Sequence, residues 1–286
     1  SGSASPHDRR GDTVEQTSRE AARTSDVLIV VSPAKALDFE SPLPTKKYTV
    51  PTMMDESRQL VSIMARQSPD DLADLMSISP ALAELNFERF QDWEPPTSPD
   101  PARPAVLAFN GDTYLGLDAP GTFDERDYTH AQKVLRILSG LHGVLRPLDL
   151  IQPYRLEMGS KVRHGRGADL YSFWGDKVTD QLNRDLDKSP GARVLVNLAS
   201  AEYFGAVQPD RIDGRVVSPK FMDAKGDGEY KIVAFFAKRA RGSMAGWIVR
   251  ERVTNVSAIP EFTDGGYRYS PERSTPDEPV FLRRND

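Results

Sequence analysis

Short apolar runs recur along the chain and predict strands. The run VLIVVS at 27–32 is apolar and rich in β-branched residues, which is typical of a strand buried on both faces. Runs of similar character predict further strands at 105–110, 193–200, 214–221, 229–238 and 278–284. We expect the last of these to lie at a sheet edge.

Other stretches place apolar residues three and four positions apart, which predicts one buried face of a helix. Residues 54–67 follow this pattern, with Leu60, Ile63 and Met64 on one face. The pairs Ser68–Pro69 and Ser79–Pro80 are typical of an N-cap residue followed by proline in the first helical turn. They predict two further helices.

A longer helix is predicted over 124–140, because Val134, Ile137, Leu138 and Leu141 have helical spacing and Gly140 suits a helix end. Residues 170–186 and 239–253 are amphipathic and predict two more helices. Strand-like and helix-like segments alternate irregularly, so the sequence predicts an α+β or mixed α/β fold.

Residues 27–286 are expected to form one large domain, preceded by a polar tail at 1–26. The tail has neither strand nor helix pattern, and we expect it to be disordered. It also lacks the apolar core of a secretory signal, and the sequence contains no apolar run long enough to span a bilayer. These features favour a cytoplasmic location.

The residue types narrow the chemistry. The 286 residues contain no cysteine, which excludes disulfides, cysteine nucleophiles and thiolate metal sites. The four histidines, at positions 7, 130, 142 and 164, show no metal-ligand spacing. We therefore expect neither a bound metal nor a cofactor.

Charge is distributed unevenly along the chain, although the net charge is only −5. Residues 51–130 contain 15 acidic and 5 basic side chains, whereas residues 131–252 contain 14 acidic and 21 basic ones. This asymmetry predicts a surface with one basic face. An ordinary mixed surface would also satisfy these counts.

Five loop segments carry candidate site residues. In the first, Ser32 ends the predicted strand 27–32 and Lys35 follows it, at a place where loops commonly present functional groups. Lys35 is a candidate to hold a phosphate or act as a base, and the alternative is a lysine facing water. In the second, Asp112 and Tyr114 lie between two glycines. This stretch matches neither the Walker phosphate-binding loop nor the dinucleotide-binding glycine motif.

The third segment is LSGLHGVLRPLDLIQPYRLEMG at 138–159, where Gly140 and Gly143 predict a tight turn between two helices. Backbone amides of such a hairpin can grip phosphates. Seven basic and two acidic residues occupy 131–166, and we assign phosphate binding to four of these bases: Arg136, Arg146, Arg155 and Lys161. A hairpin inside the core would explain the glycines equally well.

The remaining segments add basic and acidic groups. Lys238, Arg239 and Arg241 lie where an apolar run meets a predicted helix, which suits an anion. Ser200 ends the strand predicted at 193–200, and Glu202 and Tyr203 follow it. Glu157 and Glu202 are the best carboxylate candidates for acid–base work.

Several long motifs resemble those of the YaaA peroxide stress protein family. They are SPAKALDFESPLP, ISPALAELNFERF, AFNGDTYLGLDA, LRILSGLHGVLRPLDLIQPYRLEMG, LYSFWGDKVTDQL, VNLASAEYFGAV, SPKFMD and FAKRARGSMAGWIV, and they occur in the family's order. The resemblance covers nearly the whole chain from residue 27.

The resemblance implies resistance to hydrogen peroxide through lowered unincorporated iron. It also implies DNA binding by a single domain of unusual topology, with a basic cleft and a helix-hairpin-helix. The hairpin maps onto 138–148. The cleft draws on Lys35, Arg146, Arg155, Lys220, Lys238, Arg239 and Arg241, with Tyr154 as a further candidate beside Arg155.

One departure from the family lies at His142, where the family usually has tyrosine. A histidine there would offer a pH-dependent charge near a phosphate. The polar tail is also outside the family pattern. Together they leave room for a paralogue that turns the same cleft to another substrate.

Three functions follow. The first is a stress-response protein that binds nucleic acid through the basic cleft, largely independently of sequence. The alternative is an enzyme acting on a nucleotide, nucleoside or nucleobase, with Lys35, Glu157 and Glu202 as catalytic groups. The third is an iron-handling protein, whose site would have to use carboxylates.

Overall fold

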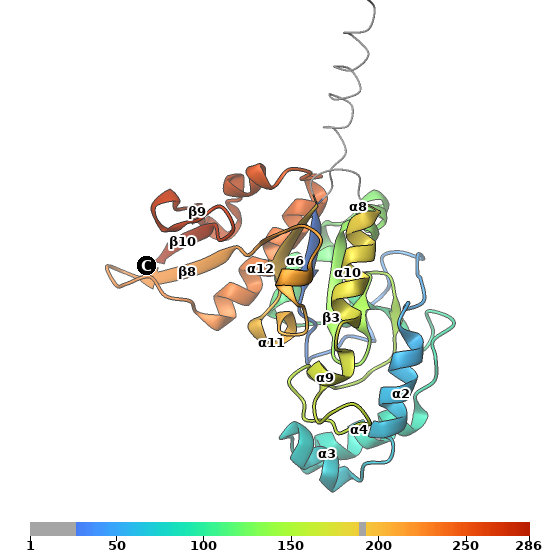
Figure 1. Ribbon diagram of the computed structural model, residues 1–286. Coiled ribbons are helices and arrows are strands. Elements are labelled where there is room, and N and C mark those ends of the chain that lie inside the picture. Colours follow the sequence, from blue (N-terminus) through green and yellow to red (C-terminus); the bar gives the residue numbers. More distant parts are fainter. Residues whose placement is uncertain (1–26, 189–192) are drawn as a thin grey trace, which may run out of the picture.

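The computed structural model describes residues 27–188 and 193–286, and the tail predicted at 1–26 lies outside them. Helices and strands are mixed along the chain, as the sequence predicts (Figure 1). Three sheets occur in the described part of the chain, with five, three and two strands. The fold is therefore mixed α/β.

The five-stranded sheet forms the centre of the molecule. Its strands, in spatial order, are β4 (Gly143–Leu145), β3 (Leu135–Ser139), β1 (Leu28–Val31), β6 (Val194–Leu198) and β7 (Arg215–Val217). β1 is parallel to both β3 and β6, and β4 is antiparallel to β3. All four residues of β1 are buried, which explains its uninterrupted apolar sequence.

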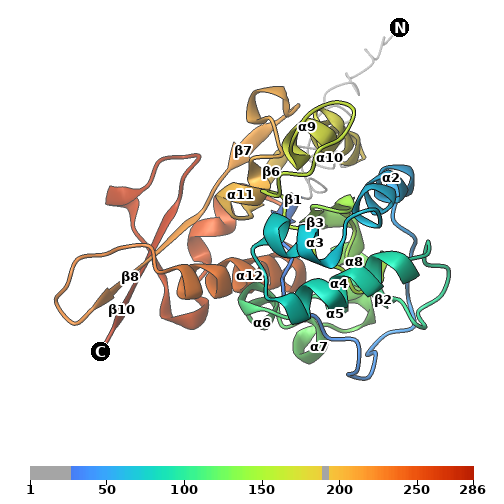
Figure 2. The same ribbon diagram turned by 90° about the horizontal axis from the view of Figure 1, so that it is seen from below.

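Helices cover both faces of this sheet, as Figure 2 shows. On one face, α8 (Glu125–Val134) and α12 (Ala234–Arg250) contact β1 and each other. On the opposite face, α10 (Lys177–Asp187) buries Val178, Leu182 and Leu186. This arrangement follows from right-handed crossovers, because the chain moves from β1 to β3 in one direction and from β3 to β6 in the other.

The helical prediction near the N-terminal part of the domain is confirmed. α2 spans Met54–Met64, α3 spans Pro69–Met76 and α4 spans Pro80–Asp92. Ser68 and Ser79 are the N-caps of the last two, and each side chain accepts a hydrogen bond from a backbone amide three residues later.

The prediction of a strand at 105–110 is wrong. These residues follow β2 (Arg103–Pro104) and form the short helix α5 (Ala105–Ala108), in which every residue is buried. A run that is apolar on all sides does not distinguish a buried helix from a buried strand. The same ambiguity affects 229–238, where α12 begins at Ala234 instead of a strand.

The predicted helix-hairpin-helix is absent from its expected position. Helix α8 ends at Val134, and the residues that follow form β3, a turn and β4. The pattern that suggested a helix is instead a strand buried on both faces, since all five residues of β3 are buried. The helix predicted over 170–186 is also divided, because Gly175 adopts a positive φ of 50° between α9 (Leu170–Trp174) and α10.

A three-stranded sheet projects from the main body, as Figures 1 and 2 show. Its order is β8 (Lys220–Lys225), β10 (Val280–Asn285) and β9 (Arg268–Tyr269). β10 is thus the middle strand, which corrects the prediction of an edge strand. Asp223, which is buried, holds this sheet together through Tyr267 and Arg283.

The remaining elements are short. They are β5 (Leu150–Ile151), α6 (Asp112–Leu117), α7 (Ala119–Thr122), α11 (Ala201–Phe204), η1 (Pro209–Arg211), η2 (Val256–Glu261), η3 (Asp264–Gly266) and η4 (Pro271–Arg273). β5 pairs with β2, and α6 packs closely on α12.

Candidate functional site

A pocket with a volume of about 560 Å³ lies at the carboxyl ends of β1 and β6. The chain leaves β1 toward β3 and later returns to β6 on the other side of β1, so this is the switch point of the sheet. Crevices at such points are common ligand sites in open α/β sheets. Five segments line the pocket: the loops 32–36 and 154–157, residues 111–113 at the start of α6, residues 200–203 at the start of α11, and Lys238 and Arg241 of α12.

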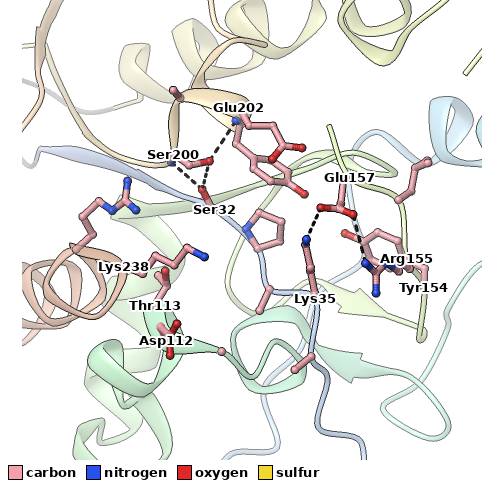
Figure 3. Close-up of a pocket in the computed structure, with 18 residues that line it drawn as sticks. Ser32, Lys35, Asp112, Thr113, Tyr154, Arg155, Glu157, Ser200, Glu202 and Lys238 are labelled. Carbon is pink, nitrogen blue, oxygen red and sulfur yellow. Dashed lines mark hydrogen bonds and ion pairs between the residues drawn. The ribbon is translucent and has the colours of Figure 1, made fainter. Parts of the chain in front are cut away.

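Two serines join the strand ends beneath the pocket. Ser32 directly follows β1, and its hydroxyl accepts a hydrogen bond from the backbone amide of Ser200, at 2.8 Å. The Ser32 hydroxyl also lies 3.2 Å from the Ser200 hydroxyl (Figure 3). Tyr114 donates its hydroxyl proton to the Ser32 carbonyl at 2.9 Å. These contacts fix the loop that carries Lys35.

A carboxylate between two cations forms one wall. Glu157 Oε1 lies 2.9 Å from Lys35 Nζ, and Glu157 Oε2 lies 3.5 Å from Arg155 Nη2 (Figure 3). The side chains of Arg155 and Glu157 are 20% and 23% exposed, whereas that of Lys35 is 65% exposed. Alternate positions of an extended segment share a face, which places Arg155 and Glu157 together.

A second carboxylate is used to build the loop. Glu202 Oε1 accepts a hydrogen bond from the backbone amide of Gly159 at 3.0 Å. The backbone carbonyl of Glu202 accepts another from the Tyr171 hydroxyl at 2.7 Å. Glu202 thereby ties α11 to the segment that carries Glu157.

Two cations of α12 form another part of the lining. Arg241 Nη1 donates to the Ala199 carbonyl at 3.2 Å, and Arg241 Nε is buried without a hydrogen-bond partner. Burial lowers the pKa of Arg241 from its ordinary value. Lys238 points toward the pocket from the preceding turn of the helix (Figure 3).

Two tyrosines contribute neutral hydroxyls to the lining. Burial raises the pKa of both Tyr154 and Tyr203, so each remains protonated at physiological pH. The Tyr154 hydroxyl lies 2.6 Å from the hydroxyl of Ser139, the last residue of β3. Three parallel strands therefore contribute to this one edge.

The structure brings most of the predicted candidates to this pocket. Its lining includes Ser32, Lys35, Asp112, Tyr154, Arg155, Glu157, Ser200, Glu202, Tyr203, Lys238 and Arg241. It also includes residues that the sequence analysis did not single out, such as Thr113 and Leu156. The sequence could have indicated them only through their position, because each immediately follows a candidate residue.

The lining does not include several predicted phosphate-binding residues. Arg136 is buried and makes an ion pair with Asp185 at 2.7 Å, so it is not available to a phosphate. Burial raises the pKa of the Asp185 carboxyl, but its contacts with Arg136 and Lys188 together exceed this effect and hold the pKa below its ordinary value.

Five other predicted site residues, four cations and one tyrosine, also lie outside the lining. Arg146 pairs with the buried Asp149 at 2.8 Å, Lys220 with Glu278 at 2.8 Å, and Lys161 lies 3.9 Å from Asp169. Tyr114 lies beneath the pocket, where it holds Ser32. Arg239 is on the surface of α12 outside the lining.

The turn between β3 and β4 is buried, which corrects its expected role as an exposed phosphate grip. His142 is fully buried, its Nδ1 lies 2.8 Å from the Ser57 hydroxyl, and burial lowers its pKa to about 3. It therefore carries no charge near neutral pH. Gly143 has a φ of 67°, and a side chain there would meet Trp174 and Met53.

Gly140 lies directly behind the pocket. A β-carbon at this position would overlap the backbone carbonyl of Leu156, the residue between Arg155 and Glu157. The glycine is needed for close approach of the buried turn to the wall of the site.

The described residues, 27–188 and 193–286, contain no group of three or more histidine, aspartate or glutamate side chains suited to a metal ion. Over the same residues, no helix has the length and apolar character needed to cross a membrane.

The fold and pocket define a mixed α/β protein with a charged pocket at the switch point of a largely parallel sheet. The chain belongs to the family described as Peroxide stress protein YaaA, which matches residues 27–273. It is also similar to a UPF0246 protein of Tolumonas auensis (strain DSM 9187 / NBRC 110442 / TA 4). The two are 52% identical over 260 residues, which cover 91% of this chain and 99% of the relative.

Proposed function

We propose that the protein is an enzyme acting on a nucleotide, nucleoside or nucleobase in the switch-point pocket. The contact of Glu157 with both Lys35 and Arg155 carries this proposal. A site that only grips phosphate gains nothing from a carboxylate, because it neutralises the cations and repels the ligand. A carboxylate beside an amine does provide a proton acceptor and a proton donor within one site.

The size and lining of the pocket support a small ligand. A volume of about 560 Å³ is within the usual range for small-molecule sites. Apolar surface from Ala34, Leu156 and the two lining tyrosines suits a flat ring, and the charged groups around it suit polar substituents. Lys35, Glu157 and Glu202 remain the candidate catalytic groups.

Nucleic-acid binding through the same opening is the second candidate. Four cations of the lining favour it: Lys35, Arg155, Lys238 and Arg241. Such binding would be mostly electrostatic and would weaken steeply as salt increases. The hairpin is not part of this candidate, because its residues are buried strands.

Calorimetry of the full chain with nucleobases, nucleosides and nucleotides tests the first candidate, followed by chromatography of any bound ligand to detect a product. Lys35→Met and Glu157→Gln are expected to abolish product formation. Lys161→Met removes an exposed lysine outside the lining and serves as the matched control. The absence of binding by every compound in the panel would overturn this proposal.

Titration with single-stranded and duplex DNA and with RNA at low and physiological salt separates the two candidates. Binding that falls with salt and is reduced by Lys35→Met, without turnover of any small ligand, would favour the nucleic-acid function. Tight binding of a small ligand with turnover would favour the enzyme.

A further inference from the structure

The cations of the pocket are neutralised unequally. Lys35 and Arg155 share the carboxylate of Glu157. In contrast, no carboxylate of the described residues lies within 4.0 Å of a nitrogen of Lys238 or Arg241. The α12 side of the pocket therefore holds two positive charges without an ion-pair partner.

Arg241 is the more informative of the two, because it is partly buried. Its one hydrogen bond to the described protein is the contact of Nη1 with the Ala199 carbonyl, and its buried Nε has no partner. A buried guanidinium without a counter-charge is costly. Guanidinium nitrogens offer five donors in a planar fork, which matches two oxygens of one anion.

Lys238 is placed to reach the same anion. It precedes Arg241 by three residues on α12, and positions three apart lie on one helix face. In Figure 3, Lys238 extends over Thr113, opposite the wall that holds Lys35 and Glu157. The Thr113 segment belongs to α6, which packs against α12 through Gly242, where a β-carbon would overlap the Thr113 carbonyl.

The acidic groups of the lining do not cancel this charge. Glu157 is held by Lys35 and Arg155, and Glu202 by the Gly159 amide. Asp112 is the third acid of the lining and belongs to the α6 side of the pocket, but it forms no ion pair with Lys238 or Arg241. Two cations and one acid leave this side with a net positive charge.

We infer that Arg241 and Lys238 form an anion subsite that takes the phosphate of a ligand whose remaining part lies against Lys35 and Glu157. Arg241 binds two phosphate oxygens through its fork, and Lys238 binds a third. The ligand is then oriented, with its anionic end at α12 and its reacting end at the opposite wall. The nucleotide-like identity of the ligand rests on the proposed function. The preference for an oxyanion rests only on the charges of Arg241 and Lys238.

Binding of inorganic phosphate, nucleoside 5′-monophosphates and the matching nucleosides, measured by calorimetry at constant ionic strength, tests the subsite. Arg241→Met is expected to weaken binding of phosphate and monophosphates by about 10- to 100-fold. Nucleoside affinity should stay unchanged in the same variant. Arg239→Met removes an equal charge from the same helix outside the lining, and should retain full affinity.

Thermal unfolding would report any folding defect of Arg241→Met. Because Lys238 is exposed, Lys238→Met tests the subsite independently of such a defect. Phosphate that binds to wild type and not to either variant supports the subsite, even if no nucleoside binds and the proposed function fails. Phosphate that does not bind wild type, or binds both variants as tightly as wild type, overturns it. Binding of an oligonucleotide with a terminal monophosphate, compared with binding of the free monophosphate, shows whether the phosphate belongs to a nucleotide or to the end of a nucleic acid.

Discussion

The hydroxyl of Ser32 accepts a hydrogen bond from the backbone amide of Ser200, a residue 168 positions away in the sequence. Ser32 follows β1 and Ser200 follows β6, so this bond joins the two strand ends where the pocket opens. The amide of Ser200 has no place in the sheet ladder and depends on the serine oxygen.

Removal of this oxygen is expected to destabilise the protein. Ser32→Ala leaves the Ser200 amide without its acceptor and should lower the free energy of unfolding by about 1–2 kcal/mol. Ser257→Ala removes an exposed serine hydroxyl outside the pocket lining, and should cost less. Urea denaturation of the two variants provides the measurement, and equal losses would contradict the role assigned to the Ser32 oxygen.

Glu157→Gln separates catalysis from positioning. The amide keeps the shape of the carboxylate but neither accepts a proton nor balances Lys35 and Arg155. An acid–base role predicts a loss of turnover of about 100- to 10,000-fold, with binding of an anionic ligand retained or tightened. Steady-state kinetics and calorimetry of the same preparation give both quantities. Glu261→Gln, outside the lining, is the control, and unchanged turnover in Glu157→Gln would leave Glu157 with a positioning role alone.

Gly140→Ala is expected to lower both the stability of the protein and its affinity for a ligand in the pocket. The new methyl group overlaps the Leu156 carbonyl and must displace the segment that carries Arg155 and Glu157. Overpacking of this kind typically costs about 1–3 kcal/mol, and ligand affinity should fall with it. A side chain at Gly165 meets nothing within 4 Å, so Gly165→Ala is a matched control that should change neither quantity.

The buried ring of His142 predicts a loss of stability in acid. Its pKa is about 3 in the folded protein and about 6.5 in an unfolded chain. Between these values the unfolded state binds the additional proton. The free energy of unfolding therefore falls with decreasing pH, at up to about 1.4 kcal/mol per pH unit, and this contribution is fully present above about pH 6.5.

Urea denaturation between about pH 7.5 and about pH 4.5, which covers the upper part of the range between the two pKa values, measures the slope. The neighbours of the ring, Ser57 and Tyr154, are neutral there, and the contribution of the histidine is the difference in slope between the wild type and His142→Phe. His142→Phe should reduce the slope. His164→Asn leaves the buried His142 ring in place, and the slope should be unchanged. An unaltered slope in His142→Phe would contradict this assignment.

The sequence predicted local features well where a single segment determines them. The caps at Ser68 and Ser79 depend only on the residues that follow, and both are confirmed. Arg155 and Glu157 occupy alternate positions of one segment, and the ion pair between them follows from that local spacing. Candidates in loops after strands also converge, because parallel strands end at one edge.

The errors arose where burial by other segments decides the structure. Residues 135–139 satisfy a helical apolar pattern, but they insert as a strand beside β1, where every side chain is covered. Arg136 belongs to a basic stretch, and only the fold supplies the buried Asp185 that neutralises it. Likewise, no pattern around position 142 reveals that the histidine is enclosed.

The position of β1 between β3 and β6 has a consequence for folding. Both of its neighbours come from distant parts of the sequence, so β1 gains its hydrogen bonds only after two long loops have closed. Pairings of this kind are slow to form. The Ser32–Ser200 contact needs the same closures, and we therefore expect the pocket to assemble late, when nearly all of the sheet is already in place.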